Sequence, residues 1–202
     1  MAAYAFTDNF ENMVQVAELN KANSFTGVQT FTGSVESTSK TNGTVVITGG
    51  LGVQGDLFAN RVWGAVWNDL ADCVDVPDNT VLEPGYAYCF DGENYFKSTK
   101  YLEDGFIGIH SDTAGFYMGK RPSTQLHAGV AGFVLAHVDK EYPVGTPLTC
   151  GEGGILTKIN DKDMPYNPHK IVATYWKNES AEKWGPVGQE ISVNGRKWVK
   201  VV

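Results

Sequence analysis

The sequence predicts an all-β protein in three parts: an N-terminal segment with a short helix over 1–22, a glycine-rich β-shaft over 23–66, and a compact β-barrel or β-sandwich domain over 67–202. Two observations indicate this fold class. The 202 residues include 23 glycines and only 19% charged residues, which is typical of short strands joined by turns. In the C-terminal part, aromatic and β-branched runs flank turn residues such as Asp91-Gly92, which is the pattern of β-hairpins.

The N-terminal segment has the pattern of one amphipathic helix over about 9–22. Asp8 followed three positions later by Glu11 resembles a capping box. Apolar residues then recur at helical spacing, at Phe10, Met13, Val14 and Ala17. Because so short a helix is not stable alone, we expect these four residues to anchor the chain on a partner or on a larger assembly.

The segment over 23–66 is rich in Ser, Thr, Gly and Asn, and Phe-Thr-Gly at 25–27 returns at 31–33. It has too few large apolar residues for a core of its own, which leaves disorder or a thin β-structure whose core is shared between chains. Apolar residues alternate along it at Val45, Ile47, Leu51 and Val53. This alternation favours the shared β-structure.

Gly50, Gly52 and Gly55 form the pattern G-x-G-x-x-G directly after a β-branched run, as in a dinucleotide-binding loop. That loop requires a following helix and an acidic residue about 20 positions further on. Asp75 lies at the right distance, but the residues between Gly55 and Gly64 are too few for the helix. We therefore expect these glycines at tight β-turns or near the axis of a multi-chain shaft, with no cofactor beside them.

The other polar motifs predict neither catalysis nor a metal site. The four aspartates over 69–78 lack the alternation and the glycine of a calcium loop, so we expect a solvated acidic turn. His-Ser-Asp at 110–112 has the residue types of a hydrolytic triad, but the side chains of sequence neighbours diverge. Three widely spaced cysteines are expected to be free thiols: Cys73, Cys89 and Cys150.

The net charge of −7 and the lack of a Lys/Arg cluster argue against a nucleic-acid partner. No stretch approaches the roughly 18 apolar residues of a membrane span, and no export signal is recognised, so we expect a soluble protein made in the cytoplasm. Three aromatic residues flank the polar loop over 177–183: Tyr175, Trp176 and Trp184. Such residues suit stacking on a sugar ring or contact with a partner surface, and they equally suit covering the end of a barrel.

Three phrases, in order, resemble bacteriophage fibre proteins. The run LNKANSFTGVQTFTGSV at 19–35 is similar to one that opens a fibre shaft. The run at 37–72 is similar to a glycine-rich shaft that closes on a W-N-D-x-A-E junction, with Asp72 in place of the glutamate. The runs at 108–120, 143–159 and 192–202 look like a C-terminal β-domain of phage virion proteins.

The resemblance implies a phage virion structural protein that is not an enzyme. It implies a homotrimeric fibre, spike or decoration, with an intertwined trimeric shaft, attached to a capsid or tail protein by its N-terminus and exposing the C-terminal domain. Head and tail locations stay open, as does attachment to a host-surface glycan. Some relatives of the C-terminal domain are self-cleaving chaperones for trimer assembly, which would implicate Asn68, Asp69 and Asp72.

Overall fold

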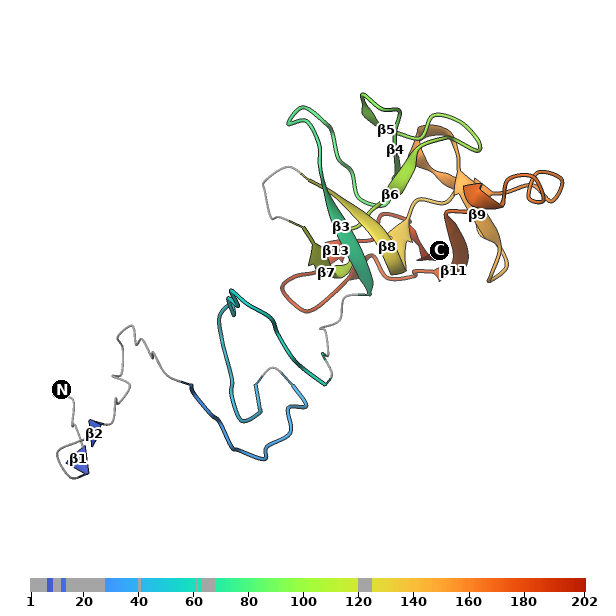
Figure 1. Ribbon diagram of the computed structural model, residues 1–202. Coiled ribbons are helices and arrows are strands. Elements are labelled where there is room, and N and C mark those ends of the chain that lie inside the picture. The colour runs from blue at the N-terminus through green and yellow to red at the C-terminus, as the bar shows by residue number, and fades with distance from the viewer. Residues whose placement is uncertain are drawn as a thin grey trace. The chain divides into compact units, whose positions relative to one another are not determined.

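The computed structural model describes residues 28–39, 41–60, 62, 68–119 and 125–202, together with the short strands β1 (Thr7–Asp8) and β2 (Asn12–Met13) (Figure 1). The chain divides into two units, Met1–Asn60 and Arg61–Val202.

Strands β1 and β2 pair in antiparallel fashion, with Thr7 opposite Met13 and Asp8 opposite Asn12. The helix predicted over 9–22 is therefore not formed at Asn12–Met13, where the chain is extended. A short apolar stripe stabilises a helix only when it packs against a partner, so its pattern alone does not fix the local structure. The other proposed anchor residues, Phe10, Val14 and Ala17, lie outside the described residues.

Within 28–39 and 41–60 the described chain forms no strand, although the sequence predicts short strands there. Local order comes from side chains instead: Asn42 Oδ1 accepts hydrogen bonds from the backbone N–H groups of Thr38 and Ser39, both at 2.9 Å. A strand needs a neighbour for its backbone N–H and C=O groups. The described part of this segment does not provide that neighbour, and the trimeric shaft stays a prediction.

The second unit is built on a ten-stranded, mostly antiparallel sheet (Figure 1). Its strands are β3 (Asp69–Asp75), β4 (Ala87–Phe90), β5 (Tyr95–Lys97), β6 (Phe106–His110), β7 (Ala114–Met118), β8 (Gln125–Ala136), β9 (Pro147–Cys150), β10 (Leu156–Lys158), β11 (Ala173–Asn178) and β14 (Lys197–Val201). The main path runs β10-β9-β11-β14-β8-β6-β4-β5, and β3 pairs with β8 and, in parallel, with β7. A separate hairpin joins β12 (Lys183–Trp184) to β13 (Ile191–Ser192).

The sheet curls back on the long strand β8. Its residues 132–136 pair with β14, while residues just beyond its end contact β10 through a bridge between Val138 and Leu156. The backbone N–H of Leu156 also donates to the carbonyl of His137 at 2.8 Å. The predicted all-β class is thus confirmed, and the C-terminal unit is a curled, half-barrel sheet with two short 3-10 turns, Glu152–Gly154 and Pro168–Lys170.

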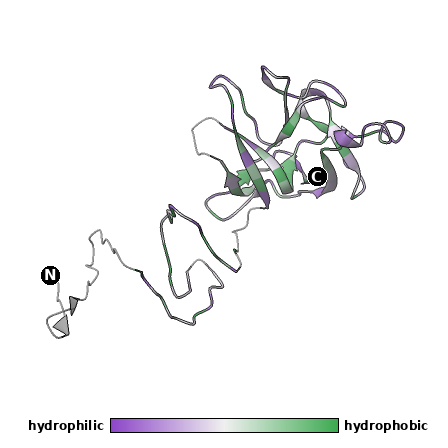
Figure 2. Cartoon of the chain, in the orientation of Figure 1, coloured by the Kyte–Doolittle hydropathy of each residue, from purple (hydrophilic) through white to green (hydrophobic). Residues whose placement is uncertain are grey.

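The concave side of this sheet encloses the main apolar core, and Figure 2 shows hydrophobic residues on the strands with hydrophilic residues in many loops. Leu148, Leu156 and Val199 are completely buried there. Strands β10 and β9, which carry Leu156 and Leu148, are neighbours in the sheet, and β11 lies between β9 and β14, which carries Val199. Burial of each such side chain contributes about 1.5–3 kcal/mol, which makes this core the main source of stability.

Turn chemistry accounts for both hairpins that the sequence predicts. Between β4 and β5, Gly92 has a φ of +104°, and Asp91 Oδ1 accepts from the N–H groups of Glu93 (2.9 Å) and Asn94 (2.7 Å). A positive φ favours glycine and a short acceptor side chain closes the turn. The second hairpin joins β9 to β10 with Cys150 opposite Leu156, and in its turn Gly153 and Gly154 have φ values of +67° and +81°.

Candidate functional site

A buried carboxyl group lies at the start of β3, where the chain enters the sheet. The Asp69 side chain is only 7% exposed. Its Oδ1 accepts hydrogen bonds from Thr113 Oγ1 at 2.8 Å and from Ser111 Oγ at 3.1 Å. Both hydroxyl residues are buried in the connection between β6 and β7. Asp69 Oδ2 is buried and has no hydrogen-bond partner among the described residues.

Burial raises the pKa of Asp69 to about 6, against an ordinary value of 3.8. The hydrogen bonds from Thr113 and Ser111 act in the opposite direction, and the nearby charge of Asp112 adds to the increase in pKa. A carboxyl group with a pKa near neutrality can both accept and release a proton under physiological conditions. Such a perturbed group in a buried cluster is a candidate for acid–base chemistry.

The backbone on either side of this carboxyl is held by neighbouring strands. The N–H of Asn68 donates to the carbonyl of Thr113 at 3.0 Å, and the carbonyl of Asn68 accepts from the N–H of Phe133 at 3.2 Å. Gly132 has a φ of +103°, and a Cβ atom there would lie 2.5 Å from the Asn68 carbonyl oxygen. Close approach of β8 to the Asn68–Asp69 peptide therefore requires glycine at this position.

The three residues at 110–112 contact three different partners. Ser111 donates to Asp69, Asp112 pairs with Arg196, and His110 Nδ1 accepts from the backbone N–H of His127 at 3.1 Å. Their side chains diverge, as the sequence analysis expects for neighbouring residues, so the three residues do not form a triad. Burial lowers the pKa of His110 to about 4, so its imidazole is neutral at pH 7.

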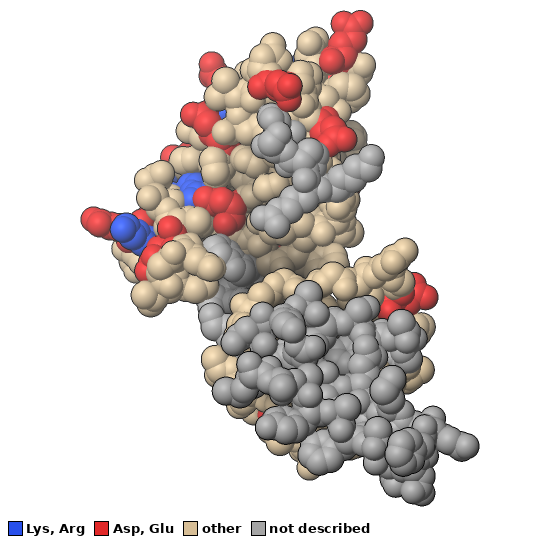
Figure 3. Space-filling model, turned by 90° about the vertical axis from the view of Figure 1, so that its left-hand side faces the viewer, with Lys and Arg blue, Asp and Glu red and all other residues tan. Residues whose placement is uncertain are grey.

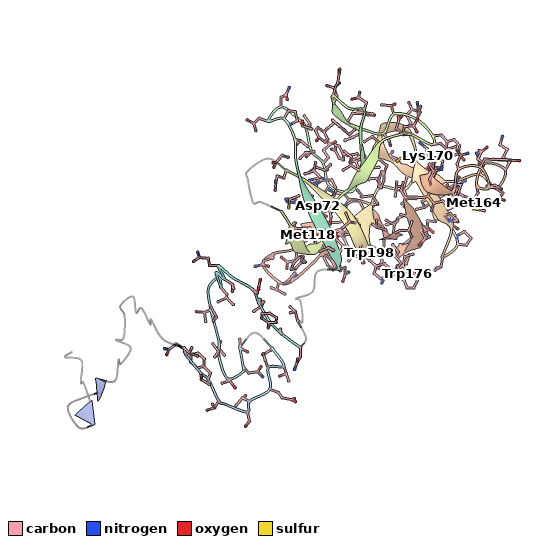
Figure 4. All side chains as sticks on the ribbon, viewed as in Figure 1. Asp72, Met118, Met164, Lys170, Trp176 and Trp198 are labelled. Atoms are coloured by element: carbon pink, nitrogen blue, oxygen red, sulfur yellow. The ribbon has the colours of Figure 1, made fainter. Side chains whose placement is uncertain are left out.

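A second candidate site is a small aromatic pocket of about 170 Å³. Its lining residues come from β8, β11, β12, β14 and two adjoining loops; they are Asn68, Phe133, Trp176, Lys177, Glu179, Trp184 and Trp198. Figure 4 labels Trp176 and Trp198 on this part of the sheet. We call this cavity the tryptophan pocket.

The tryptophan pocket brings together two of the three aromatic residues that the sequence analysis singled out. Trp176, which is 44% exposed, and Trp184 both line it. Tyr175 lies elsewhere: its side chain is 3% exposed and belongs to the main core, so it is not available for a surface contact. Sequence reasoning missed Phe133 and Trp198, which are distant in the chain and carry no local signal. It also did not single out Glu179, which lies within the polar loop over 177–183.

The residues proposed for the shaft remain open to solvent in one chain. Val45, Ile47 and Val53 are 50%, 49% and 48% exposed. A Cβ atom added at Gly50, Gly52 or Gly55 would meet nothing within 4 Å. None of these three glycines has a positive φ, so within one chain the backbone conformation there does not require glycine.

Within the described ranges, no three His, Cys, Asp or Glu side chains are grouped so that they could hold a metal ion. The three cysteines are free thiols in the structure. Figure 3 shows acidic side chains spread over the described part of one face, with few basic ones among them. No helix among the described residues has the length and apolar character needed to cross a membrane.

No protein-family model matches the chain, and no curated protein matches its sequence. Among solved structures, the chain is similar to the crystal structure of the pre-mature bacteriophage phi29 gene product 12. The identity is 14% and the TM-score is 0.48. The match covers 74% of this chain and 23% of that chain, so this chain corresponds to less than a quarter of the phage protein's length.

Proposed function

We propose that this chain is a structural protein of a bacteriophage particle that assembles into a homotrimeric fibre, spike or decoration through its N-terminal unit. The three fibre-like phrases at 19–35, 37–72 and beyond 108 support this assignment, because they occur in the order in which a shaft, a junction and a C-terminal β-domain follow one another. The proposal requires no catalysis and no cofactor.

The observation that carries the proposal is the exposure of large apolar side chains along the described part of 28–62. Val28 is 94% exposed, Phe58 91% and Leu57 67%, and Val45 and Ile47 are half exposed. Burying such side chains contributes about 1.5–3 kcal/mol each. A single chain leaves these side chains in water and lacks this stabilisation, whereas three chains that share a core would bury them.

Backbone hydrogen bonding supports the same assembly. The described residues of 28–39 and 41–60 form no strand, so their N–H and C=O groups have no ladder partner among the described residues. Neighbouring copies would supply those partners and would give the β-prone residues at 44–48 the extended pairing that their sequence favours.

We assign the N-terminal segment over 1–22 to attachment on a capsid or tail protein, and the C-terminal unit to the outer surface of the particle. The protein would be made in the bacterial cytoplasm and incorporated into the virion. A C-terminal unit in that position meets the host surface, where it would serve attachment.

Native mass spectrometry of the full chain tests the assembly. We expect a species of three times the 22.0 kDa chain mass. Replacing both Val45 and Ile47 by aspartate places charges in the shared core and should convert the trimer to monomer. Aspartate at Thr44 and Thr48, which are exposed polar positions in the same run, is the matched control and should retain the trimer. A monomeric wild-type chain at micromolar concentration would contradict the proposal.

A second function, self-cleavage at the junction before β3, is favoured by the Asp69 site. Hydrolysis would add one water molecule across the Asn68–Asp69 peptide bond. Asp69 would accept a proton from the attacking water and pass it to the leaving backbone nitrogen. The Phe133 N–H, which already donates to the Asn68 carbonyl, would stabilise the negative charge that develops on that oxygen. The products would be a carboxylate on Asn68 and an amine on Asp69.

Intact mass spectrometry after incubation of the full chain at pH 7 tests self-cleavage. This second function predicts two fragments, 1–68 and 69–202, formed at a rate that does not depend on protein concentration. Asp69→Asn should stop the reaction because an amide cannot accept the proton. Asp72, which the resemblance also implicates, is exposed on the same strand and is not among the hydrogen-bond partners of Asp69, so Asp72→Asn should leave the reaction unchanged. A single species of 22.0 kDa after prolonged incubation would exclude this function without affecting the trimer proposal.

A further inference from the structure

The tryptophan pocket combines aromatic walls with fixed polar groups. Phe133 and Trp176 form one wall, with ring centroids 5.3 Å apart and an interplanar angle of 50°. Trp184 and Trp198 form another, with ring centroids 5.0 Å apart at 73°. Trp198, which is only 3% exposed, is the buried member of the second wall, whereas Trp176 is 44% exposed and reaches solvent.

A β-bulge accounts for the exposure of Trp176. In the pairing of β11 with β14, Tyr175 lies opposite Val199, but the next paired residue, Lys177, lies opposite Trp198. Trp176 is therefore the extra residue of the bulge. Bulges re-aim side chains and are common beside functional sites. Here the bulge directs Trp176 out of the sheet while Tyr175 stays in the core.

Glu179 supplies a fixed acceptor at the pocket. Its Oε2 accepts a hydrogen bond from Trp198 Nε1 at 2.8 Å, and its Oε1 accepts from the backbone N–H of Ala181 at 3.0 Å. The hydrogen bond from Trp198, followed by that from Ala181, lowers the pKa of Glu179, so the group is a carboxylate at neutral pH. Each oxygen keeps a lone pair for a further donor.

These features define the chemistry of a fitting ligand. Flat aromatic faces suit an apolar ring face, whereas Glu179 accepts hydroxyl hydrogens and Lys177 and the Asn68 amide offer donors. A phosphate-bearing ligand would be repelled by the Glu179 carboxylate and by the chain's net charge of −7. A purely apolar segment would bury the Glu179 carboxylate without a donor for its remaining lone pairs. The volume of about 170 Å³ suits a small ligand portion, such as a single ring.

We infer that the tryptophan pocket binds one ring of a neutral saccharide, with Trp176 as the stacking platform and Glu179 as the hydroxyl acceptor. The inference deepens the proposed role in host attachment and rests on it, since a C-terminal unit on the virion surface meets saccharides of the bacterial envelope. In this arrangement Phe133 packs against Trp176 and Trp198 packs against Trp184, and these contacts position the two aromatic walls.

Titration of the full chain with neutral sugars, followed by tryptophan fluorescence and by indole N–H resonances, tests the inference. The probes are glucose, galactose, rhamnose, N-acetylglucosamine and N-acetylgalactosamine at millimolar concentrations. We expect at least one of them to give saturable binding that shifts the indole resonance of Trp176. The lack of a saturable response to all five overturns the inference, and a trimer in native mass spectrometry then leaves the assembly proposal standing.

Three variants assign the binding to this pocket. Trp176→Ala should weaken binding at least tenfold, and Glu179→Gln should weaken it several-fold while keeping an oxygen for Trp198 Nε1. The matched control is Tyr166→Ala, which removes an aromatic ring that is 82% exposed outside the pocket and should leave binding unchanged. Near-ultraviolet circular dichroism verifies that each variant is folded. Equal affinity of folded Trp176→Ala and wild type overturns the assignment.

Discussion

Asp112→Ala is expected to lower the free energy of unfolding by about 3–5 kcal/mol, because it leaves a buried guanidinium group without its charge partner. The Arg196 side chain is 3% exposed, and its two terminal nitrogens donate to the two carboxylate oxygens of Asp112 at 2.6 and 2.9 Å. Arg196 also donates to the carbonyls of Val193 and Ser192. The pair thereby fastens the β13–β14 connection to the connection between β6 and β7.

Urea unfolding of the full chain at pH 7, followed by tryptophan fluorescence, measures this loss. The matched control is Asp161→Ala, which removes the partner of Lys158 at 2.9 Å in a pair whose carboxylate is 81% exposed. Exposed pairs contribute about 0–1 kcal/mol, so the control should barely change stability. Replacing Arg196 by methionine in the Asp112→Ala background should recover part of the loss. An Asp112→Ala effect as small as the control would contradict the prediction.

Asp69→Asn is expected to change how stability depends on pH. In the folded chain the pKa of Asp69 is about 6, against 3.8 for the ordinary group, so the folded state binds more protons between these two values. Stability supplied by protonated Asp69 is complete below pH 3.8 and is lost as the pH rises through 6. At about 1.4 kcal/mol for each pKa unit, the loss is about 3 kcal/mol.

The asparagine variant has no such titration. The free energy of unfolding of Asp69→Asn relative to wild type should therefore rise by about 3 kcal/mol between pH 3.8 and pH 7. Urea unfolding at several pH values checks this difference. Asp72→Asn, at an exposed position of β3, should show no comparable trend. A constant difference between wild type and Asp69→Asn over this range would show that burial does not perturb the carboxyl group.

Local sequence predicted several parts of the C-terminal unit correctly. The β4–β5 hairpin follows from Asp91 and Gly92, because glycine readily adopts a positive φ and aspartate has a short acceptor side chain that closes the turn. The β9–β10 hairpin and the all-β class follow from the same kind of signal. The divergence of the residues at 110–112 also follows from backbone geometry alone.

Elements of the first unit were not predictable in this way. The apolar stripe over 9–22 predicts a helix, yet Asn12 and Met13 lie in a strand. The alternation at 45–53 predicts strands, yet the described residues of that run form none. In both cases the pattern describes which side chains need burial, whereas the local conformation depends on what buries them.

By itself the sequence determined the β-rich class and the turns, because each of these depends on composition or on residues close together in the chain. Only the tertiary structure decided that Asp69 meets Ser111 and Thr113, which are 42 and 44 positions away. It also decided that Trp176 faces a pocket with Trp198 while Tyr175 is buried. Strand order and a bulge bring these side chains together. Both arise from backbone pairing between residues far apart in the chain, which cannot be recognised in the local sequence.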